Sequence, residues 1–276
     1  MVVLQENLFA KLEYFNPFGS IKDRAALQIL RDAEKSGEIS RTSTIIEATS
    51  GNMGISLSAI GRIMGYKTII VMPENMSVRR REMIKAFGGE LVLTEKEGGM
   101  MKSLEVAENI KSQTINAYSP HQFDNFSGVW AHYLTTAPEI YEQTNGDVDT
   151  VICGIGTGAT IMGIANYFYG KGVKIIGVEP EKSPFFSRGY SGSHKIEGIG
   201  AGFCPRIINV NLIDEFVTVS DEESVLCARE LNECKGLFVG ISSGAVFAAA
   251  KKISLREEFK NKNIVMIFAD GGDRYL

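Results

Sequence analysis

The sequence lacks the features of disulfide-bonded, metal-binding and membrane-spanning proteins. It has only four cysteines and three histidines in 276 residues, and neither set shows the close spacing of a metal site. No Cys-x-x-Cys pair is present, and Cys153 lies in an apolar run, which indicates reduced thiols in a cytoplasmic protein. We therefore expect no metal in the chemistry. No apolar run is long enough to cross a bilayer, and the start shows no signal-peptide pattern, so we expect no membrane partner.

The chain also lacks an excess of either charge. Its 29 basic and 33 acidic residues give a net charge of −4, which does not suggest a surface for nucleic acid or anionic membranes. The short basic cluster from Arg79 to Arg81 is most simply the solvated face of a helix. A hydrophobic content of 44% over 276 residues is sufficient for two lobes around one cleft. These features fit a two-lobed enzyme.

From Thr44 onward, apolar strands alternate with helices. Fully apolar strands in such an alternation are typical of a parallel sheet covered on both faces, so the predicted fold class is α/β. A further strand with two different faces is predicted at 8–14. The other predicted strands span 44–48, 68–72, 90–93, 150–153, 174–178 and 264–268. The predicted helices span 52–64, 77–87 and 129–143, with others through 106–110, after 154, from about 221 and through 250.

Two irregular segments interrupt the alternation. Residues 118–128 contain several turn formers and form the predicted seam between the two lobes. Residues 179–205 contain many glycines and serines, and irregular segments of this length are usually functional.

The stretch from Phe15 to Arg24 places Lys22 where a predicted strand turns into a helix. A turn containing proline and glycine precedes Ser20, which is the predicted N-cap. Unpaired N–H groups and the helix dipole disfavour a cation at this position, so the pKa of the Lys22 ammonium is predicted to be lowered. A neutral amine is what imine chemistry needs. The alternative is an ordinary solvated lysine at the start of a helix.

Two further loops join a predicted strand to a predicted helix. The loop from Thr49 to Gly54, Thr-Ser-Gly-Asn-Met-Gly, could hold a carboxylate, because N–H groups at a helix start favour anions. The loop from Gly240 to Ala245, Gly-Ile-Ser-Ser-Gly-Ala, offers hydroxyl groups to a ligand heteroatom. Each has a simpler interpretation as a turn with an N-cap.

A third loop, Gly154 to Thr160, has three glycines and two threonines, a composition suited to wrapping a phosphate with main-chain N–H groups and hydroxyls. It is not a Walker A loop, because no Gly-Lys-Ser/Thr follows. It does match Gly-x-Gly-x-x-Ala, and Glu179 follows at the spacing of a dinucleotide-binding fingerprint. A nicotinamide dehydrogenase is therefore an alternative, although it leaves the Lys22 and Thr49 motifs without a role.

Taken together, these motifs resemble those of cysteine synthases (O-acetylserine sulfhydrylases) and their cystathionine β-synthase relatives. The resemblance covers nearly the whole chain. It is carried, in order, by Asn-Pro-Phe-Gly-Ser-Ile-Lys-Asp-Arg (16–24), Thr-Ser-Gly-Asn-Met-Gly (49–54), Met-Pro-Glu-Asn-Met-Ser (72–77), Gly-Ile-Gly-Thr-Gly-Ala-Thr (154–160), His-Lys-Ile-Glu-Gly-Ile-Gly-Ala-Gly-Phe (194–203) and Gly-Ile-Ser-Ser-Gly-Ala (240–245).

The resemblance implies fold type II of the pyridoxal 5'-phosphate (PLP) enzymes, with two lobes that each contain a mostly parallel twisted sheet flanked by helices. It implies that Lys22 is the Schiff-base lysine and that the remaining cofactor contacts come from Asn52 at the 3'-oxygen, Gly156, Thr157, Gly158, Ala159 and Thr160 at the phosphate, and Ser242 at the pyridine nitrogen. The implied site for the substrate carboxylate consists of Thr49, Ser50, Gly51, Asn52, Met53 and Gln122.

The resemblance also implies a smaller substrate-closing lobe at residues 15–126 and a larger phosphate-binding lobe at 1–14 and 127–276. Substrate binding is then expected to draw the lobes together. The implied partners are a second copy of the chain in a homodimer and the tail of a serine acetyltransferase.

The implied reaction is β-replacement on a β-substituted L-alanine, with O-acetyl-L-serine and sulfide giving L-cysteine and acetate. A neutral serine at the ring nitrogen favours β-replacement over transamination. Cysteine desulfhydrase, lanthionine-forming and cystathionine-forming relatives share most of the motifs and stay open as alternatives. So does a family member without catalytic activity that serves as a binding partner.

The chain departs from the family pattern in three places. Met53 stands where a threonine is common, which puts one substrate hydrogen bond in question. The usual Gly-Asn-Thr-Pro segment does not precede the lysine motif, and the sequence stops at Gly272 to Leu276, where relatives continue. Either a missing edge strand and tail weaken the large lobe or the dimer contact, or the sequence is part of a longer product.

Overall fold

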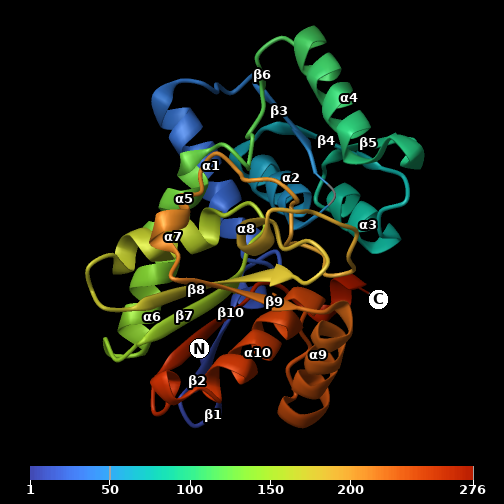
Figure 1. Cartoon of the computed structure of the whole chain (residues 1–276). Coiled ribbons are helices and arrows are strands. Elements are labelled where there is room, and N and C mark those ends of the chain that lie inside the picture. Colours follow the sequence, from blue (N-terminus) through green and yellow to red (C-terminus); the bar gives the residue numbers. More distant parts are fainter. Residues whose placement is uncertain (50, 276) are drawn as a thin grey trace.

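Two sheets form the framework of the chain (Figure 1). The computed structural model describes residues 1–49 and 51–275. The larger sheet has the strand order β1 (Val2–Gln5), β2 (Leu8–Leu12), β10 (Ile264–Phe268), β7 (Thr150–Gly154), β8 (Lys174–Pro180) and β9 (Glu215–Val219). The smaller sheet has the order β5 (Glu90–Thr94), β4 (Lys67–Pro73), β3 (Thr44–Ala48) and β6 (Ala117–Tyr118).

The described strands are parallel except for one pair. Every pairing in the smaller sheet is parallel, and in the larger sheet β1 alone of these strands runs antiparallel to its neighbour β2. All five residues of β3 and of β10 are buried, as expected for strands covered on both faces. The predicted α/β class with mostly parallel sheets is therefore confirmed.

Helices lie on both faces of each sheet (Figure 1). They are α1 (Lys22–Ser36), α2 (Asn52–Met64), α3 (Val78–Ala86), α4 (Gly99–Gln113), α5 (Phe126–Ala131), α6 (Ala137–Gln143), α7 (Ala159–Phe168), α8 (Phe185–Arg188), α9 (Asp221–Lys235) and α10 (Ile241–Ser254). A π-helical turn, His132–Thr136, joins α5 to α6. Short 3-10 turns occur at Glu13–Phe15, Lys96–Gly98, Val210–Leu212, Glu257–Phe259 and Gly272–Tyr275.

The sequence pattern locates most of these elements and misses the edges of the larger sheet. The predicted strands 44–48 and 264–268 and the predicted helix 52–64 agree with β3, β10 and α2. The edge strands β1 and β9 escape prediction: both are short and include half-exposed residues, and the apolar run of β1 covers only Val2, Val3 and Leu4. The helix predicted at 129–143 begins three residues earlier, and the segment 179–205 contains the end of β8 and the short helix α8.

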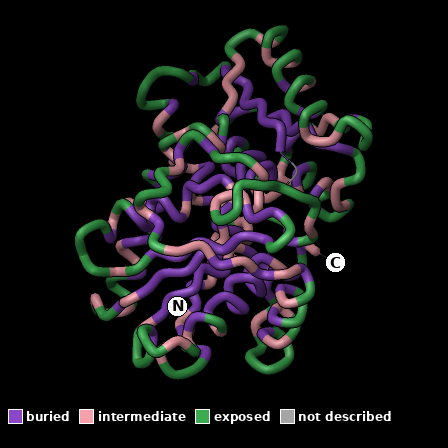
Figure 2. Tube along the Cα trace, viewed as in Figure 1, coloured by how far each residue is buried: buried purple, intermediate pink, exposed green. Residues whose placement is uncertain are grey.

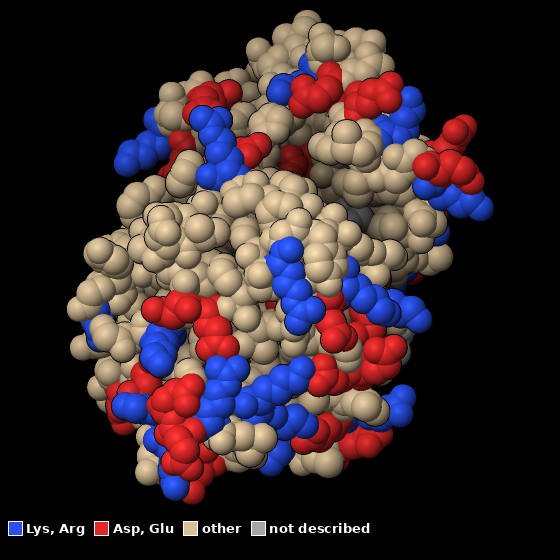
Figure 3. Space-filling view, in the orientation of Figure 1, with Lys and Arg blue, Asp and Glu red and all other residues tan. Residues whose placement is uncertain are grey.

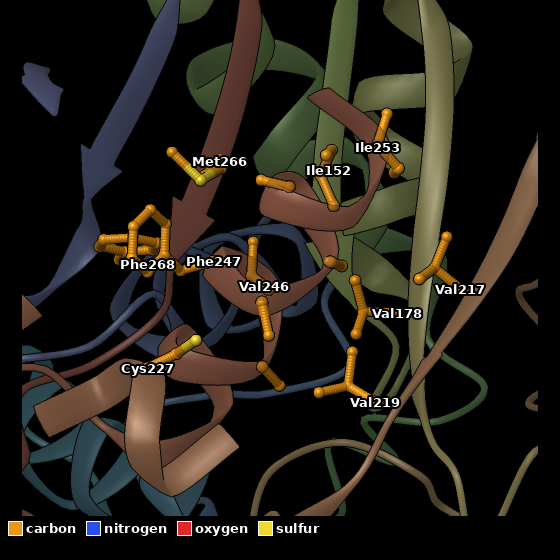
Figure 4. Packing of buried hydrophobic residues seen from close by; sticks show 14 of the residues in the cluster. Ile152, Val178, Val217, Val219, Cys227, Val246, Phe247, Ile253, Met266 and Phe268 are labelled. Carbon is orange, nitrogen blue, oxygen red and sulfur yellow. The ribbon is translucent and has the colours of Figure 1, made fainter. Parts of the chain in front are cut away.

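The core of the larger sheet is divided between its two faces. On one face, α10 packs against the strands, with Val246, Phe247 and Ile253 lying near Ile152 and Met266 (Figure 4). On the other face, α7 packs with a second set of buried side chains. The buried trace in Figure 2 follows the strands and these helices, while the loops around them are exposed. Burial of one large apolar side chain contributes roughly 1.5–3 kcal/mol, so both layers hold the sheet rigidly.

Three findings concern features that the sequence lacks. All four cysteines, in the part of the chain that the structure describes, carry free thiols, and two of them are buried. Within those residues, no cluster of three or more His, Cys, Asp or Glu side chains could hold a metal ion. No helix among them has the length and apolar character that a membrane crossing requires.

Candidate active site

Segments that follow several parallel strands meet at one edge of the sheets. Strands β2, β10 and β7 are adjacent and parallel, so their carboxyl ends lie side by side. The segments that leave them contain Lys22 after β2, Asp270 after β10 and Gly156 after β7. Asn52, which follows β3 of the smaller sheet, lines the same cavity as these residues. The fold therefore brings together motifs that are far apart in the sequence.

Lys22 lies in the first turn of α1, as predicted, and the backbone around it is fixed. The N–H of Ile21 donates to the carbonyl oxygen of Ala269 at 2.9 Å, which ties the start of α1 to the end of β10. The carboxylate of Asp23 accepts a hydrogen bond from the N–H of Phe18 at 2.7 Å. The amine thus stands on a rigid element, as a site that must hold a covalent ligand requires.

Burial lowers the pKa of the Lys22 amine to about 8, while the negative charge of Asp270 acts in the opposite direction. The predicted direction is correct, but the cause differs from the predicted helix-start effect, because desolvation of the ammonium dominates. The predicted N-cap is displaced by one residue: Ile21 is the cap, and the hydroxyl of Ser20 accepts from the Lys22 N–H at 3.3 Å. A substantial share of the amine is therefore neutral near pH 8.

Lys22 lines two neighbouring cavities. The inner cavity has a volume of about 60 Å³ and is lined by Lys22, Asn52, Gly156, Thr157, Gly158, Thr160, Ser242, Asp270 and Tyr275, among others. It shares Lys22, Asn52 and Thr157 with an outer cavity of about 420 Å³. The outer volume lies within the range of about 300 to 1,000 Å³ that small-molecule sites have. Nearly all the predicted cofactor residues thus line one space.

In the glycine-rich loop between β7 and α7, positions 156 and 158 have no room for a side chain. A Cβ atom on Gly156 would lie 2.2 Å from the carbonyl oxygen of Gly198, and Gly158 adopts a left-handed φ of +88°. The hydroxyl of Thr157 accepts from the N–H of Ala159 at 3.4 Å, at the start of α7. Ala159 itself lines neither cavity, since its side chain packs into the core. The remaining main-chain N–H groups can therefore approach an anion closely.

His132 contacts Thr160 at the end of this glycine-rich segment, a role that no sequence motif indicates. It lies in the π-helical turn, is 1% exposed, and one ring nitrogen lies 3.3 Å from the hydroxyl of Thr160. The other ring nitrogen lies 2.9 Å from the hydroxyl of Thr136. Burial, and then the charge of Lys22, lower the pKa of His132 to about 3. The imidazole is therefore neutral and acts as a fixed hydrogen-bond partner for Thr160.

The loop after β3 forms one wall of the outer cavity. Thr49, Gly51, Asn52 and Met53 all line it, together with Gln122 from the opposite side. The fifth residue predicted in this loop, Ser50, lies outside the described residues. Each remaining member of the predicted carboxylate site is thus present in one place.

A buried carboxylate connects strand β3 to the segment that contains Gln122. Glu47 lies at the end of β3, is 6% exposed, and accepts hydrogen bonds from the N–H groups of His121 and Gln122 at 3.2 and 3.4 Å. His121 has a positive φ of 49°, which shows how tightly the chain turns here. Burial raises the pKa of Glu47 to about 7. The position of Gln122 therefore depends on a group that titrates near neutral pH.

This group predicts a pH-dependent difference in stability between the wild type and Glu47→Gln. The pKa of Glu47 is about 7 in the folded chain, and its ordinary value is 4.5. Between these pH values, the folded state therefore binds more protons at Glu47 than the unfolded state does. Stability from this group is therefore present at low pH and is lost as pH rises toward 7. We expect the free energy of unfolding of the wild type, relative to Glu47→Gln, to fall by on the order of 2 to 3 kcal/mol between pH 4.5 and 8.

Urea unfolding at a series of pH values measures this difference. The exposed Glu6 provides a matched control, because Glu6→Gln makes the same side-chain change away from the contacts with His121 and Gln122. Parallel stability curves for Glu47→Gln and the wild type would show that the carboxyl is not ionising in this window.

Glu179, on which the dinucleotide alternative depends, is engaged elsewhere. Its two carboxylate oxygens accept from the N–H groups of Phe186 and Ser187 at 2.7 and 3.0 Å, at the start of α8. The side chain is 2% exposed and lines neither cavity. It is therefore not available to a ribose hydroxyl, and the geometry disfavours a nicotinamide site.

The predicted exposure of the basic cluster is wrong for Arg80. The sequence predicts a solvated helix face for the cluster Arg79 to Arg81, but Arg80 is 4% exposed and lines the outer cavity. Its guanidinium donates to Glu197 and lies 5.2 Å from the ring centre of Tyr275. The basic triplet repeats one residue type on three different faces of α3, so composition alone does not distinguish the inward residue. On the face shown in Figure 3, basic and acidic side chains are interspersed.

The sequence is similar to known pyridoxal-phosphate-dependent enzymes. Residues 3–270 match the family described as pyridoxal-phosphate dependent enzyme. The chain is 47% identical to cysteine synthase B of Campylobacter jejuni, over 98% of this chain and 90% of that protein. The family match covers all the loops that form the two cavities except the turn Gly272–Tyr275, which lies beyond it.

Solved structures of related enzymes have the same fold as this chain. The crystal structure of a cysteine synthase (OASS) from Entamoeba histolytica superposes with a TM-score of 0.94 at 41% identity, over 97% of this chain and 80% of that one. A hydrogen sulfide-producing enzyme from Fusobacterium nucleatum superposes with a TM-score of 0.92 at 41% identity, over 98% and 91%. The chain therefore belongs to the cysteine synthase family of pyridoxal-phosphate-dependent, fold type II enzymes.

Proposed function

We propose that the protein catalyses β-replacement, in which O-acetyl-L-serine and sulfide give L-cysteine and acetate. The observation that carries the proposal is the half-buried Lys22, whose amine has a pKa lowered by desolvation to about 8, in a cavity that a glycine-rich anion loop also lines. The names of the related enzymes from C. jejuni and E. histolytica support the same reaction.

The residues around Lys22 fit pyridoxal phosphate. The loop at Gly156 and Gly158 packs too closely for any Cβ atom, and it lines the inner cavity together with the hydroxyl-bearing Thr157 and Thr160, which suits a phosphate. We propose that Asn52 binds the 3'-oxygen and that Ser242 binds the ring nitrogen. When bound, the cofactor supplies an electron sink for the substrate α-carbon, which allows the α-proton and then the β-substituent to leave.

Lys22 is the proposed acid–base group as well as the attachment point. Its Nζ atom would take the α-proton of a substrate held in the cavity, and desolvation keeps a useful fraction of the amine unprotonated near pH 8. Ser242, a neutral hydroxyl donor or acceptor, does not hold a positive charge on the ring nitrogen as a carboxylate would. This favours β-replacement over transamination.

The loop after β3 is the proposed carboxylate site. Thr49, Gly51 and Asn52 line the outer cavity at the start of α2, where N–H groups favour an anion. Gln122 closes the site from the opposite wall. Met53 contributes no hydroxyl, so we propose that this position limits polar contacts to the substrate.

We also propose that residues 15–126 form a lobe that closes over the substrate on a lobe formed by 1–14 and 127–276. The separate cores of the two sheets support this division. The seam near 118–128 lies between β6 and α5.

A homodimer is the proposed assembly in the cytoplasm. Along α5, the π-helical turn and α6, exposed apolar side chains recur with helical spacing at Phe126, Trp130, Leu134 and Tyr141. Such a stripe on one face of a helix supports contact with another copy of the chain. Binding of a serine acetyltransferase tail in the outer cavity is a further proposal, drawn from the family resemblance.

The relative from F. nucleatum that is named a hydrogen sulfide-producing enzyme supports a second candidate, the release of sulfide from L-cysteine. Steady-state assays of the PLP-loaded protein distinguish the two. We expect kcat/KM for O-acetyl-L-serine with sulfide, measured as cysteine by mass spectrometry, to exceed kcat/KM for sulfide release from L-cysteine by at least about tenfold. The opposite order would assign the desulfhydrase reaction, and no turnover in either assay would support a partner without catalytic activity.

A further inference from the structure

The Asn52 side chain is held at both ends by residues that follow β10. Its Nδ2 donates to Oδ2 of Asp270 at 2.7 Å, across 218 positions of sequence, and its Oδ1 accepts from Nη1 of Arg274 at 2.5 Å, across 222 positions. Arg274 also donates to the carbonyl oxygen of Phe18, and the hydroxyl of Tyr275 donates to Asp270 at 2.7 Å. The turn Gly272–Tyr275 accordingly lies between the two sheets, near α3 (Figure 1).

These contacts bury two opposite charges. Asp270 and Arg274 are each 1% exposed. Buried charges are costly unless they are paired and hydrogen-bonded, and apolar side chains of similar volume often fill such positions at no loss of stability. A charged pair that directs both of its members to one amide therefore suggests a requirement for the orientation of that amide.

The arrangement permits only one orientation of Asn52. A 180° rotation of the amide would place its N–H group against the Arg274 guanidinium and its oxygen against the Asp270 carboxylate, which replaces two attractive contacts with two repulsive ones. In the observed orientation, one N–H of Nδ2 goes to Asp270, and the second has no partner among the described residues. Asn52 lines both cavities, next to Lys22. The second N–H is thus available to a ligand.

Close packing keeps Asp270 in place. A Cβ atom on Gly240 would lie 2.0 Å from Oδ1 of Asp270, and the N–H of Gly240 donates to the Asp270 carbonyl oxygen at 3.0 Å. Oδ1 is buried and accepts no hydrogen bond from any residue that the structure describes. The carboxylate therefore cannot turn away from Asn52 without displacing the start of α10.

We infer that Asp270 and Arg274 are positioning residues for the cofactor, which act by fixing the Asn52 amide so that its free N–H points at an oxygen of the pyridoxal ring. The inference rests on the proposed cofactor role of Asn52. It extends the site to a pair of charges that act on the cofactor through another residue.

The competing explanation is that the pair merely fastens the turn Gly272–Tyr275 to the rest of the chain. The two explanations differ in one respect. A positioning role disappears when Asn52 is removed, whereas a fastening role does not. A double-mutant cycle between Asp270 and Asn52 therefore separates them.

The measured quantity is the dissociation constant of pyridoxal phosphate from the apoprotein, followed by fluorescence, without acetylserine or sulfide. We expect Asp270→Asn and Arg274→Met each to raise it about tenfold, which corresponds to one hydrogen bond. In an Asn52→Ala background, Asp270→Asn should change it by less than about twofold, because the two sites then no longer interact. An equal effect in both backgrounds would overturn the inference, as would wild-type affinity in both single variants.

Asp221→Asn is the matched control, because Asp221 is also buried and hydrogen-bonded, by Lys182 and the N–H of Lys195, but lines neither cavity. It should leave the dissociation constant unchanged. If Asp270→Asn does not fold, as judged by circular dichroism, the same cycle with Arg274→Met decides. If Asn52→Ala alone binds pyridoxal phosphate as tightly as the wild type, the inference fails at its first step, while the assays of β-replacement still stand or fall independently.

Discussion

Replacing Lys22 by alanine is expected to reduce cysteine formation by roughly a thousandfold or more. The substitution removes the only group proposed both to hold the cofactor covalently and to move the α-proton, and loss of a positioned acid–base group alone typically costs about 10²- to 10⁴-fold. Borohydride treatment should attach a pyridoxyl group to the wild-type chain at Lys22 and leave the variant unmodified. Mass spectrometry of the treated chains detects this difference.

The fold should survive this change. Lys22 is half-buried, and desolvation disfavours its charged form, so the loss of the amine removes an unfavourable group rather than a stabilising contact. Lys22→Arg is the matched control: it keeps a long cationic side chain but cannot supply a neutral amine, so it should be as inactive as Lys22→Ala. A Lys22→Arg variant that retains more than about a tenth of the activity would contradict an essential role for the neutral amine.

Several parts of the site could be predicted from the sequence because each is local. Lys22 follows a strand and a turn, Asn52 begins a helix, and Gly156 follows an apolar strand, so strand and helix patterns place all three at the ends of elements. Parallel strands then bring their carboxyl ends to one edge of a sheet. Local pattern and sheet direction together therefore predict which loops meet.

The rest of the site depends on contacts between distant parts of the chain. Asp270 and Arg274 follow the last strand and carry no motif of their own, yet they hold Asn52. Arg80 faces inward, where Glu197 and Tyr275 lie opposite it. For Lys22, the sequence predicts the lowered pKa for the wrong reason, since the helix start is visible in the sequence and the depth of burial is not. Pairings of this kind need the tertiary structure.

The second large effect is expected at Gly156. A methyl group there would lie 2.2 Å from the carbonyl oxygen of Gly198, and because this neighbour is backbone, it cannot yield as a flexible side chain could. One of the two loops must move, and both line the inner cavity. We expect Gly156→Ala to raise the dissociation constant of pyridoxal phosphate at least about a hundredfold, since several charge-assisted contacts to the phosphate are lost together.

Gly170→Ala tests whether this effect belongs to the cavity or to glycine replacement in general. Gly170 has a positive φ of 74°, and no described atom lies within 4 Å of the position that a methyl group would take, so alanine there should cost about 1 kcal/mol of stability through backbone strain. It should leave cofactor affinity unchanged, because the residue lines neither cavity. Titration of both apoproteins with pyridoxal phosphate makes the comparison. Similar affinity in the Gly156 and Gly170 variants would mean that the phosphate rests elsewhere, since a ligand held by this loop must respond to a displacement of its backbone.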